Sequence, residues 1–148
     1  MRISAKGRYA LAAAVDMAQQ HQNGEYITLL SISEKLGISK IYLEQVFSLL
    51  KRAELVQSIK GAQGGYQLAR SPGRITALDI LLAVEQALTE PAQQTVPETA
   101  PAIEAALRLS VFDPLDQTVK AALGGVTLAD LVSQAEKHAS EQAMMFYI

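Results

Sequence analysis

The sequence contains no cysteine and no tryptophan, and it has only two histidines. Without cysteine there is no disulfide, no thiolate metal site and no iron–sulfur cluster on cysteine ligands. Neither His21 nor His138 belongs to a metal-ligand spacing or pairs with a nucleophile, so we expect both on the surface. These absences predict a protein that is not an enzyme and has no catalytic residues, no metal and no cofactor.

A long apolar run is also missing. No stretch of the sequence approaches the roughly 18 apolar residues of a membrane span, and the opening MRISAKGRYA lacks the apolar segment of a secretion signal. We therefore expect a cytoplasmic protein that does not enter a membrane. Hydrophobic residues make up 49% of the 148 residues, which is enough to build one domain with an extension.

Charge is divided unequally along the chain. The first 74 residues hold ten Lys and Arg against five acidic residues, a formal charge of +5. The remaining 74 residues hold three Lys and Arg against ten acidic residues, a formal charge of −7. This division predicts that the first half alone binds a polyanion, with chance clustering of surface charge as the alternative.

Short helices are predicted in the first half. An apolar stripe over residues 11–18 indicates a first helix that needs a partner surface. A second helix is expected after Thr28, although Ser31 and Glu34 offer an alternative capping box for its start. Gly37 follows at the place where the end of a helix favours a left-handed residue.

Ser39 then caps a third helix that runs to about Arg52. Two short helices joined through a glycine turn predict a helix-turn-helix. At about 100° per residue, the third helix has a core arc made of Leu43, Val46, Phe47 and Leu50. The opposite arc carries the candidate DNA contacts and their neighbours: Ile41, Glu44, Gln45, Ser48 and Arg52, with Lys51 on its flank. Gln45 suits adenine and Glu44 suits a cytosine amine, whereas an ordinary solvated face is the alternative.

After residue 52 the hydrophobic period changes from 3.6 to 2. The stretches LVQSIK and YQLAR alternate on either side of GAQGG, which predicts a β-hairpin. A glycine-rich tip allows the backbone to approach a phosphate closely, and Lys60 stands beside it. A hairpin directly after a recognition helix is a wing. Residues 1–75 are therefore predicted to form a winged helix-turn-helix DNA-binding domain.

Residues 76–148 are predicted to form a helical dimerisation or regulatory region. Residues 89–101 contain three prolines, which indicates a linker. A last helix is expected from Thr127, followed by a C-terminal tail over 138–148. Between them Pro114 either kinks one long helix or begins a second one.

The C-terminal helices each carry an apolar face that the winged domain does not need. We therefore expect a homodimer, because a two-fold protein matches the two half-sites of a palindromic operator in double-stranded DNA. The expected fold class is mainly α with a small β-hairpin wing, a winged helix-turn-helix followed by C-terminal dimerisation helices.

Several stretches resemble a known family. MRISAKGRYAL, ISKIYLEQVFSLLKRAELVQSIKGAQGGYQL, ITALDIL and VTLADL are similar to the bacterial winged-helix repressors that include IscR and CymR. The iron–sulfur members of this family carry three cysteines in the loop that corresponds to residues 89–105, and this chain has none. Its closing residues, AMMFYI, resemble the end of the cysteine-metabolism branch. The resemblance covers almost the whole chain and is interrupted at the linker.

The resemblance implies which residues contact DNA. Ser4 and Lys6 correspond to positions near phosphates. On the recognition helix and the wing, the corresponding residues are Ser39, Tyr42, Glu44, Gln45, Ser48, Lys51, Lys60, Gly61 and Ala62. Ile41 departs from the family where iron–sulfur members often have a polar residue, and Leu49 replaces a basic residue. These departures concern the target sequence and not DNA binding itself.

The cysteine-metabolism branch implies a function. Its members repress cysteine and sulfur-metabolism genes with cysteine synthase (O-acetylserine thiol-lyase) as co-repressor, and O-acetylserine separates the pair. We expect Phe146, Tyr147 and the carboxylate of Ile148 to occupy the synthase active site, with packing of Met144–Ile148 on the protein's own dimer as the alternative. The alternative functions are a winged-helix repressor gated directly by a small molecule and a protein-interaction module without specific DNA binding.

Overall fold

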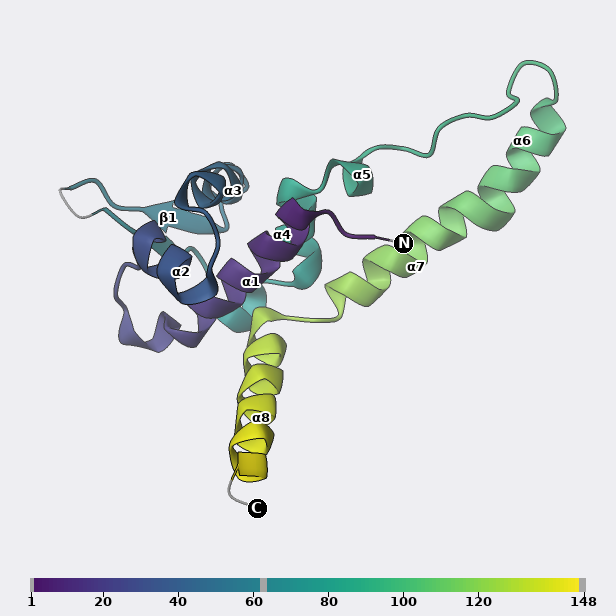
Figure 1. The fold of residues 1–148 in the computed structure, drawn as a ribbon. Coiled ribbons are helices and arrows are strands. Elements are labelled where there is room, and N and C mark those ends of the chain that lie inside the picture. The colour runs from purple at the N-terminus through teal and green to yellow at the C-terminus, as the bar shows by residue number, and fades with distance from the viewer. Residues whose placement is uncertain (1, 62–63, 147–148) are drawn as a thin grey trace.

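The computed structural model describes residues 2–61 and 64–146. Helices make up most of these ranges, beside one antiparallel pair of strands (Figure 1). The mainly α fold with a small hairpin is therefore confirmed. In chain order the elements are α1 (Ala5–Gln19), η1 (His21–Asn23), α2 (Leu29–Leu36), α3 (Lys40–Arg52), β1 (Val56–Ser58), β2 (Tyr66–Leu68), η2 (Pro72–Arg74), α4 (Ala77–Val84), α5 (Gln86–Thr89), α6 (Pro101–Leu107), η3 (Arg108–Phe112), α7 (Asp113–Gly124) and α8 (Leu128–Phe146).

One apolar core joins α1 to α3, α4 and the start of α8. Helix α1 contributes mainly small buried side chains, among them Ala10, Ala13 and Ala14. Small residues on a contact face allow neighbouring helices to approach closely. Phe47 of α3 and Leu128 of α8 are both fully buried in this core. Residues from both halves of the chain therefore pack together, and the division of the chain at residue 75 stays a prediction.

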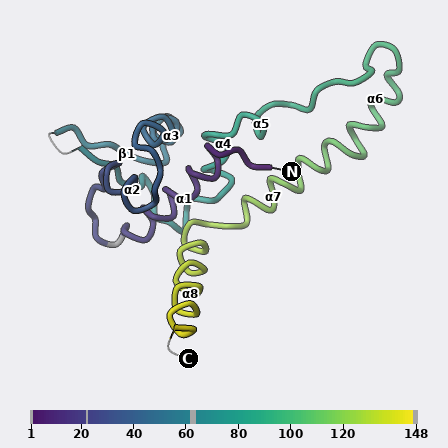
Figure 2. The backbone as a smooth tube through the Cα atoms, viewed as in Figure 1, coloured from purple at the N-terminus to yellow at the C-terminus, as the bar shows by residue number. Residues whose placement is uncertain are grey.

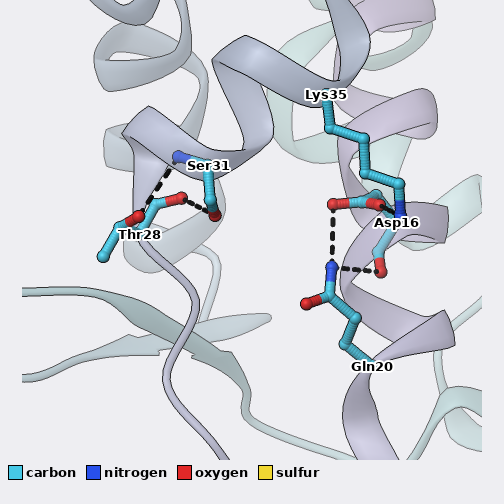
Figure 3. A network of polar contacts seen from close by, with 5 residues as sticks. All are labelled: Asp16, Gln20, Thr28, Ser31 and Lys35. Carbon is cyan, nitrogen blue, oxygen red and sulfur yellow. Dashed lines mark hydrogen bonds and ion pairs between the residues drawn. The ribbon is translucent and has the colours of Figure 1, made fainter.

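Helices α2 and α3 form the predicted helix-turn-helix pair. The Thr28 hydroxyl accepts the N–H of Ser31 at 3.1 Å, and the Ser31 hydroxyl donates to the Thr28 carbonyl at 2.8 Å (Figure 3). Of the two possible starts for α2, the structure selects Thr28, and Ser31 already lies inside the helix. Gly37 ends α2 with a left-handed φ of 69°, and Ser39 caps α3, as the sequence predicts.

An ion pair between a buried carboxylate on α1 and a half-exposed lysine on α2 joins the two helices. Asp16 on α1 is only 3% exposed, and Lys35 Nζ on α2 lies 2.6 Å from its Oδ1. The side-chain amide of Gln20 donates to Asp16 Oδ2 at 3.1 Å (Figure 3). A carboxylate removed from water is costly unless it is paired and hydrogen-bonded. The position of α2 therefore depends on Lys35 as well as on apolar packing.

The hairpin contacts the segment before α2 and the middle of α3. Strands β1 and β2 pair in antiparallel register from Val56↔Leu68 to Ser58↔Tyr66, which confirms the predicted hairpin. Tyr66 also pairs with Ile27, just before α2, through two backbone hydrogen bonds of 2.8 Å. The ring centroid of Tyr66 lies 4.9 Å from that of Phe47 on α3. The wing is thus placed relative to α3 by direct contact.

A short backbone pairing joins the start of α4 to the start of α8, and a capping box begins each of the two helices. Thr76 and Asp79 cap each other's backbone at the start of α4, and Thr127 and Asp130 do the same at the start of α8. Thr76 and Thr127 form an isolated antiparallel bridge, flanked by backbone hydrogen bonds of 2.8 Å. The beginning of the last helix is therefore fixed beside the beginning of α4.

Helices α6 and α7 form one rod, joined by the π-helical turn η3. The rod projects from the core, and α8 leaves the core in another direction (Figure 2). Pro114 is the second residue of α7, just after η3, and its ring would clash with a carbonyl four residues earlier in a regular α-helix. The wider π turn accommodates it, so Pro114 interrupts one long helix and does not begin a separate one. Residues 138–146, which the sequence sets apart as a tail, continue α8 to Phe146.

None of the helices in the described ranges is long and apolar enough to span a membrane.

The ion pair predicts an unequal effect of two lysine substitutions. Lys35→Met should lower the free energy of unfolding by about 2 kcal/mol, because it leaves the Asp16 carboxylate buried without its cation. Lys120→Met removes a cation paired with the exposed Asp116 and should change stability by less than about 0.5 kcal/mol. Urea denaturation at one protein concentration measures both. Equal losses in the two variants would contradict this role of Lys35.

Candidate nucleic-acid interface

Helix α3 presents a polar and basic face to solvent. The helix is oriented so that its apolar arc is fully buried and the candidate DNA contacts on the opposite arc are exposed. The exposed residues of this face are Ile41, Glu44, Gln45, Ser48, Lys51 and Arg52. Donors, an acceptor and cations thus share one side of a helix in the second position of a helix-turn-helix, the arrangement of a major-groove recognition helix. The contact of each side chain with DNA stays a prediction.

Two predicted contacts lie at the start of α3. The Ser39 hydroxyl is exposed and accepts the N–H of Tyr42 at 3.4 Å, so it completes the first turn. Tyr42 is half-buried, and its ring stands edge-on to that of Tyr9 on α1, with the centroids 5.4 Å apart. Tyr42 therefore lies at the edge of the exposed face, against α1, and does not stand in its middle.

The structure gives Ser4 an internal partner. Its N–H and its hydroxyl both donate to Glu85 Oε2, at 2.9 and 2.8 Å, while the hydroxyl accepts the N–H of Gly7 at 3.1 Å. A phosphate contact from the Ser4 hydroxyl would require the bond to Glu85 to break, because a hydroxyl has one proton to donate. Ser4 and Glu85 line a groove with a volume of about 690 Å³, and Lys6 and Tyr42 line it as well.

Sequence reasoning did not find Glu85. It lies 81 residues from Ser4, and no local pattern connects the two residues. The one signal was Gly7 inside a helix, because a glycine there often marks a close approach of another element. A Cβ at Gly7 would lie 2.6 Å from Glu85 Oε2 and 3.0 Å from Leu81 Cδ2.

The wing and the end of α3 share a groove. Lys51 and Lys60 line it together with Glu54 and Gln57, over a volume of about 490 Å³. The structure thus brings two of the predicted basic contacts to one surface. Gly61 is exposed beside Lys60, whereas Ala62, the last predicted contact of the wing, lies outside the described residues.

The base of the wing depends on Gly65. Its φ of 132° is one that only glycine adopts readily. A Cβ there would lie 3.0 Å from the Tyr26 Cβ and 3.3 Å from the Ile27 carbonyl oxygen. The glycine therefore allows the hairpin to pair with the segment before α2.

The predicted partner-binding residues lie at the far end of α8. Phe146 is 84% exposed at the last described turn, and Tyr147 and Ile148 lie outside the described residues. Met144 and Met145 are exposed beside Phe146. The structure therefore presents an apolar helix end to solvent at this point.

A buried carboxylate organises the loop that follows α5. Glu104 of α6 is buried and accepts the N–H groups of Thr95 and Val96, at distances from 2.8 to 3.1 Å. Three backbone donor contacts satisfy the carboxylate away from water. The loop is thereby held against the start of α6.

A model of the Rrf2 family, described as an iron-dependent transcriptional regulator, matches residues 3–134. The chain belongs to the Rrf2 family. Like its relatives, this Rrf2 protein is a DNA-binding transcriptional regulator of the winged-helix type and not an enzyme.

Named relatives come from two groups of regulators. The chain is 38% identical over 148 residues to CymR of Bacillus subtilis strain 168, with full coverage of both chains. It is 37% identical over 136 residues to IscR of Xenorhabdus nematophila, a match that covers 92% of this chain and 82% of that protein.

Solved structures give the same two names. The structure of CymR, the global cysteine regulator of B. subtilis, matches with a TM-score of 0.71 and 36% identity, over 90% of this chain and 98% of that one. The structure of T. potens IscR matches with a TM-score of 0.72 and 34% identity, over 93% of this chain and 90% of that one. The predicted family and winged-helix fold are confirmed.

The iron in the family description does not fit the residues of this chain. The sequence has no cysteine to hold an iron–sulfur cluster. In residues 2–61 and 64–146, no three His, Asp or Glu side chains gather as a metal site would require. The loop after α5 is organised instead by the Glu104 carboxylate and backbone N–H groups.

The geometry of the wing base predicts the effect of one methyl group. Gly65→Ala should cost about 2 kcal/mol of stability, because the left-handed backbone is strained and the new Cβ meets Tyr26 and Ile27. Gly73→Ala is the matched control, since a Cβ there meets nothing within 4 Å, and its change should stay within about 0.5 kcal/mol. Thermal unfolding followed by circular dichroism compares them. A Gly65→Ala variant as stable as the control would contradict this role.

Proposed function

We propose that this Rrf2 protein is a dimeric repressor that binds a palindromic operator with α3 and the wing of each protomer. The observation that carries the proposal is the orientation of α3 about its axis. This orientation buries the whole apolar arc and exposes Gln45, Ser48 and Arg52 together. The groove between α3 and the wing adds Lys51 and Lys60 beside that face. Such cations supply affinity through phosphates, while the polar face of the helix supplies base contacts.

The rod supports a dimer. Ile103, Leu109, Val111 and Leu115 are large apolar residues of α6, η3 and α7 that stand exposed in the single chain. Apolar side chains gathered along one exposed element mark an interaction surface. A second copy would cover this surface by two-fold symmetry and would present two α3 helices to successive turns of DNA.

We infer further that the operator controls genes of cysteine and sulfur metabolism and that cysteine synthase is the co-repressor. Support comes from CymR of B. subtilis, which matches over the full chain and is described as the global cysteine regulator of that organism. The exposed end of α8, with Phe146 at its last described turn, suits insertion into a pocket of a partner enzyme. In this scheme O-acetylserine competes for the same pocket and releases the repressor.

A second candidate has one observation in its favour. A cavity of about 670 Å³ lies between the loop after α5 and the rod, and its lining includes Leu88, Arg108, Phe112 and Lys120. Apolar walls with a few charged groups are typical of small-molecule sites. A repressor gated directly by a metabolite would use this cavity and would need no synthase.

The first test is DNA binding. Fluorescence anisotropy should show that the protein prefers promoter DNA of its own sulfur-metabolism genes over a scrambled duplex, with affinity that falls as salt rises. Lys60→Ala should reduce the slope of log K against log salt by about 2 for a dimer, because each lost phosphate contact is worth about 0.9. Lys137→Ala, on the acidic half, should leave the slope unchanged.

Addition of cysteine synthase and O-acetylserine separates the candidates. Tighter binding with the synthase, relaxed by O-acetylserine, would support the co-repressor. Release of DNA by a metabolite without any enzyme would favour the cavity. A third outcome is that the protein shows no preference at any salt concentration, either for these promoters or for duplexes selected from random DNA. That result would favour a protein-interaction module without specific DNA binding.

The end of α8 yields a separate prediction. Deletion of residues 145–148 should abolish binding of cysteine synthase in a calorimetric titration, because it removes the apolar helix end. The dimer should persist in sedimentation equilibrium, since the rod is intact. His138→Ala, an exposed change earlier on the same helix, is the control and should bind the synthase as the wild type does. Loss of the dimer on deletion would show that the tail packs on the protein's own partner subunit.

A further inference from the structure

The exposed face of α3 has an apolar residue at its centre. Ile41 is 70% exposed, whereas the other aliphatic residues of α3 and Phe47 are buried or half-buried. At about 100° per residue, Ser48, Arg52 and Gln45 lie within about 40° of Ile41 around the helix axis. Single apolar residues on a surface are common and need no explanation. The informative feature is that this one stands among the side chains predicted to face the bases.

Ile41 also lies at the end of α3 that enters a groove first. It is the second residue of the helix after the Ser39 cap, and residues near the start of a recognition helix contact base edges. Its side chain makes no hydrogen bond, so it offers nothing to the donors and acceptors of the groove. Its β-branched side chain has few rotamers, so little conformational entropy is lost when a surface encloses it.

The major groove offers one apolar partner, the C5-methyl group of thymine. We propose that Ile41 contacts a thymine methyl and makes this Rrf2 protein select a T·A pair in each half-site. Ile41 and Gln45 are four residues apart, which is about 6 Å along the helix. Base pairs are spaced by about 3.4 Å, so the selected thymine lies one or two pairs from the base that Gln45 contacts. This assignment rests on the proposed binding of DNA by α3.

The experiment replaces thymine by deoxyuridine, which lacks only the methyl group. Selection from random duplexes with the wild-type protein first defines the operator, and each thymine is then replaced in turn. At one position per half-site the affinity of the wild type should fall about fourfold, the value of one buried methyl. In Ile41→Ser that loss should vanish, while Ile41→Val should retain part of it.

Leu30→Ser is the matched control. Leu30 is an exposed leucine on α2, the other helix of the pair, and its loss should leave the deoxyuridine profile of the wild type unchanged. Because Ile41 is exposed, the serine variant should unfold at the wild-type temperature, and the wild-type profile is informative without any variant.

A flat deoxyuridine profile in the wild type would overturn the assignment, and so would a fourfold loss that persists in Ile41→Ser. Both results would leave DNA binding intact. A selection that enriches no sequence would instead overturn the proposed function, and the assignment with it.

Discussion

The burial of one face of α3 is the constraint on which the rest of the structure depends. Leu43, Val46, Phe47 and Leu50 are all fully enclosed, so α3 cannot rotate about its axis without exposing one of them or burying a charge. At roughly 25 cal/mol per Å² of apolar surface, such a rotation would cost several kcal/mol. The observed orientation of α3 about its axis is therefore fixed. It determines which face is exposed, where Ile41 lies, and the contact between Phe47 and Tyr66 that places the wing.

Local features could be predicted from the sequence, and long-range contacts could not. The caps at Thr28 and Ser39 and the left-handed Gly37 involve residues within a few positions, so their patterns are visible in one sequence. The bond between Ser4 and Glu85 spans 81 residues and has no such pattern. The sequence did not decide between a kinked helix and a new helix at Pro114. A proline predicts that a helix is interrupted, but it does not predict that a π turn will accommodate the interruption.

The distribution of charge along the chain predicts a preferred orientation toward DNA. The net charge is only −2, so long-range attraction to a polyanion cannot come from the total. The first 74 residues carry +5 and the rest −7, which gives the chain a charge asymmetry between its two halves. We expect such an asymmetry to favour approaches in which the basic half faces the duplex. In that orientation the rod and α8, which belong to the acidic half, would face away from the duplex.

Helix α4 is the core helix through which a movement of the rod would reach α3. It packs against α7 of the rod and against both α1 and α3 of the core. It begins at the bridge between Thr76 and Thr127, where α8 also begins, and Glu85 at its end holds the start of α1. A shift of the rod relative to the core would thus act on α4 before it reached α3. Because the core around α4 is close-packed, it should move as a unit and change the orientation of α3, not its internal structure.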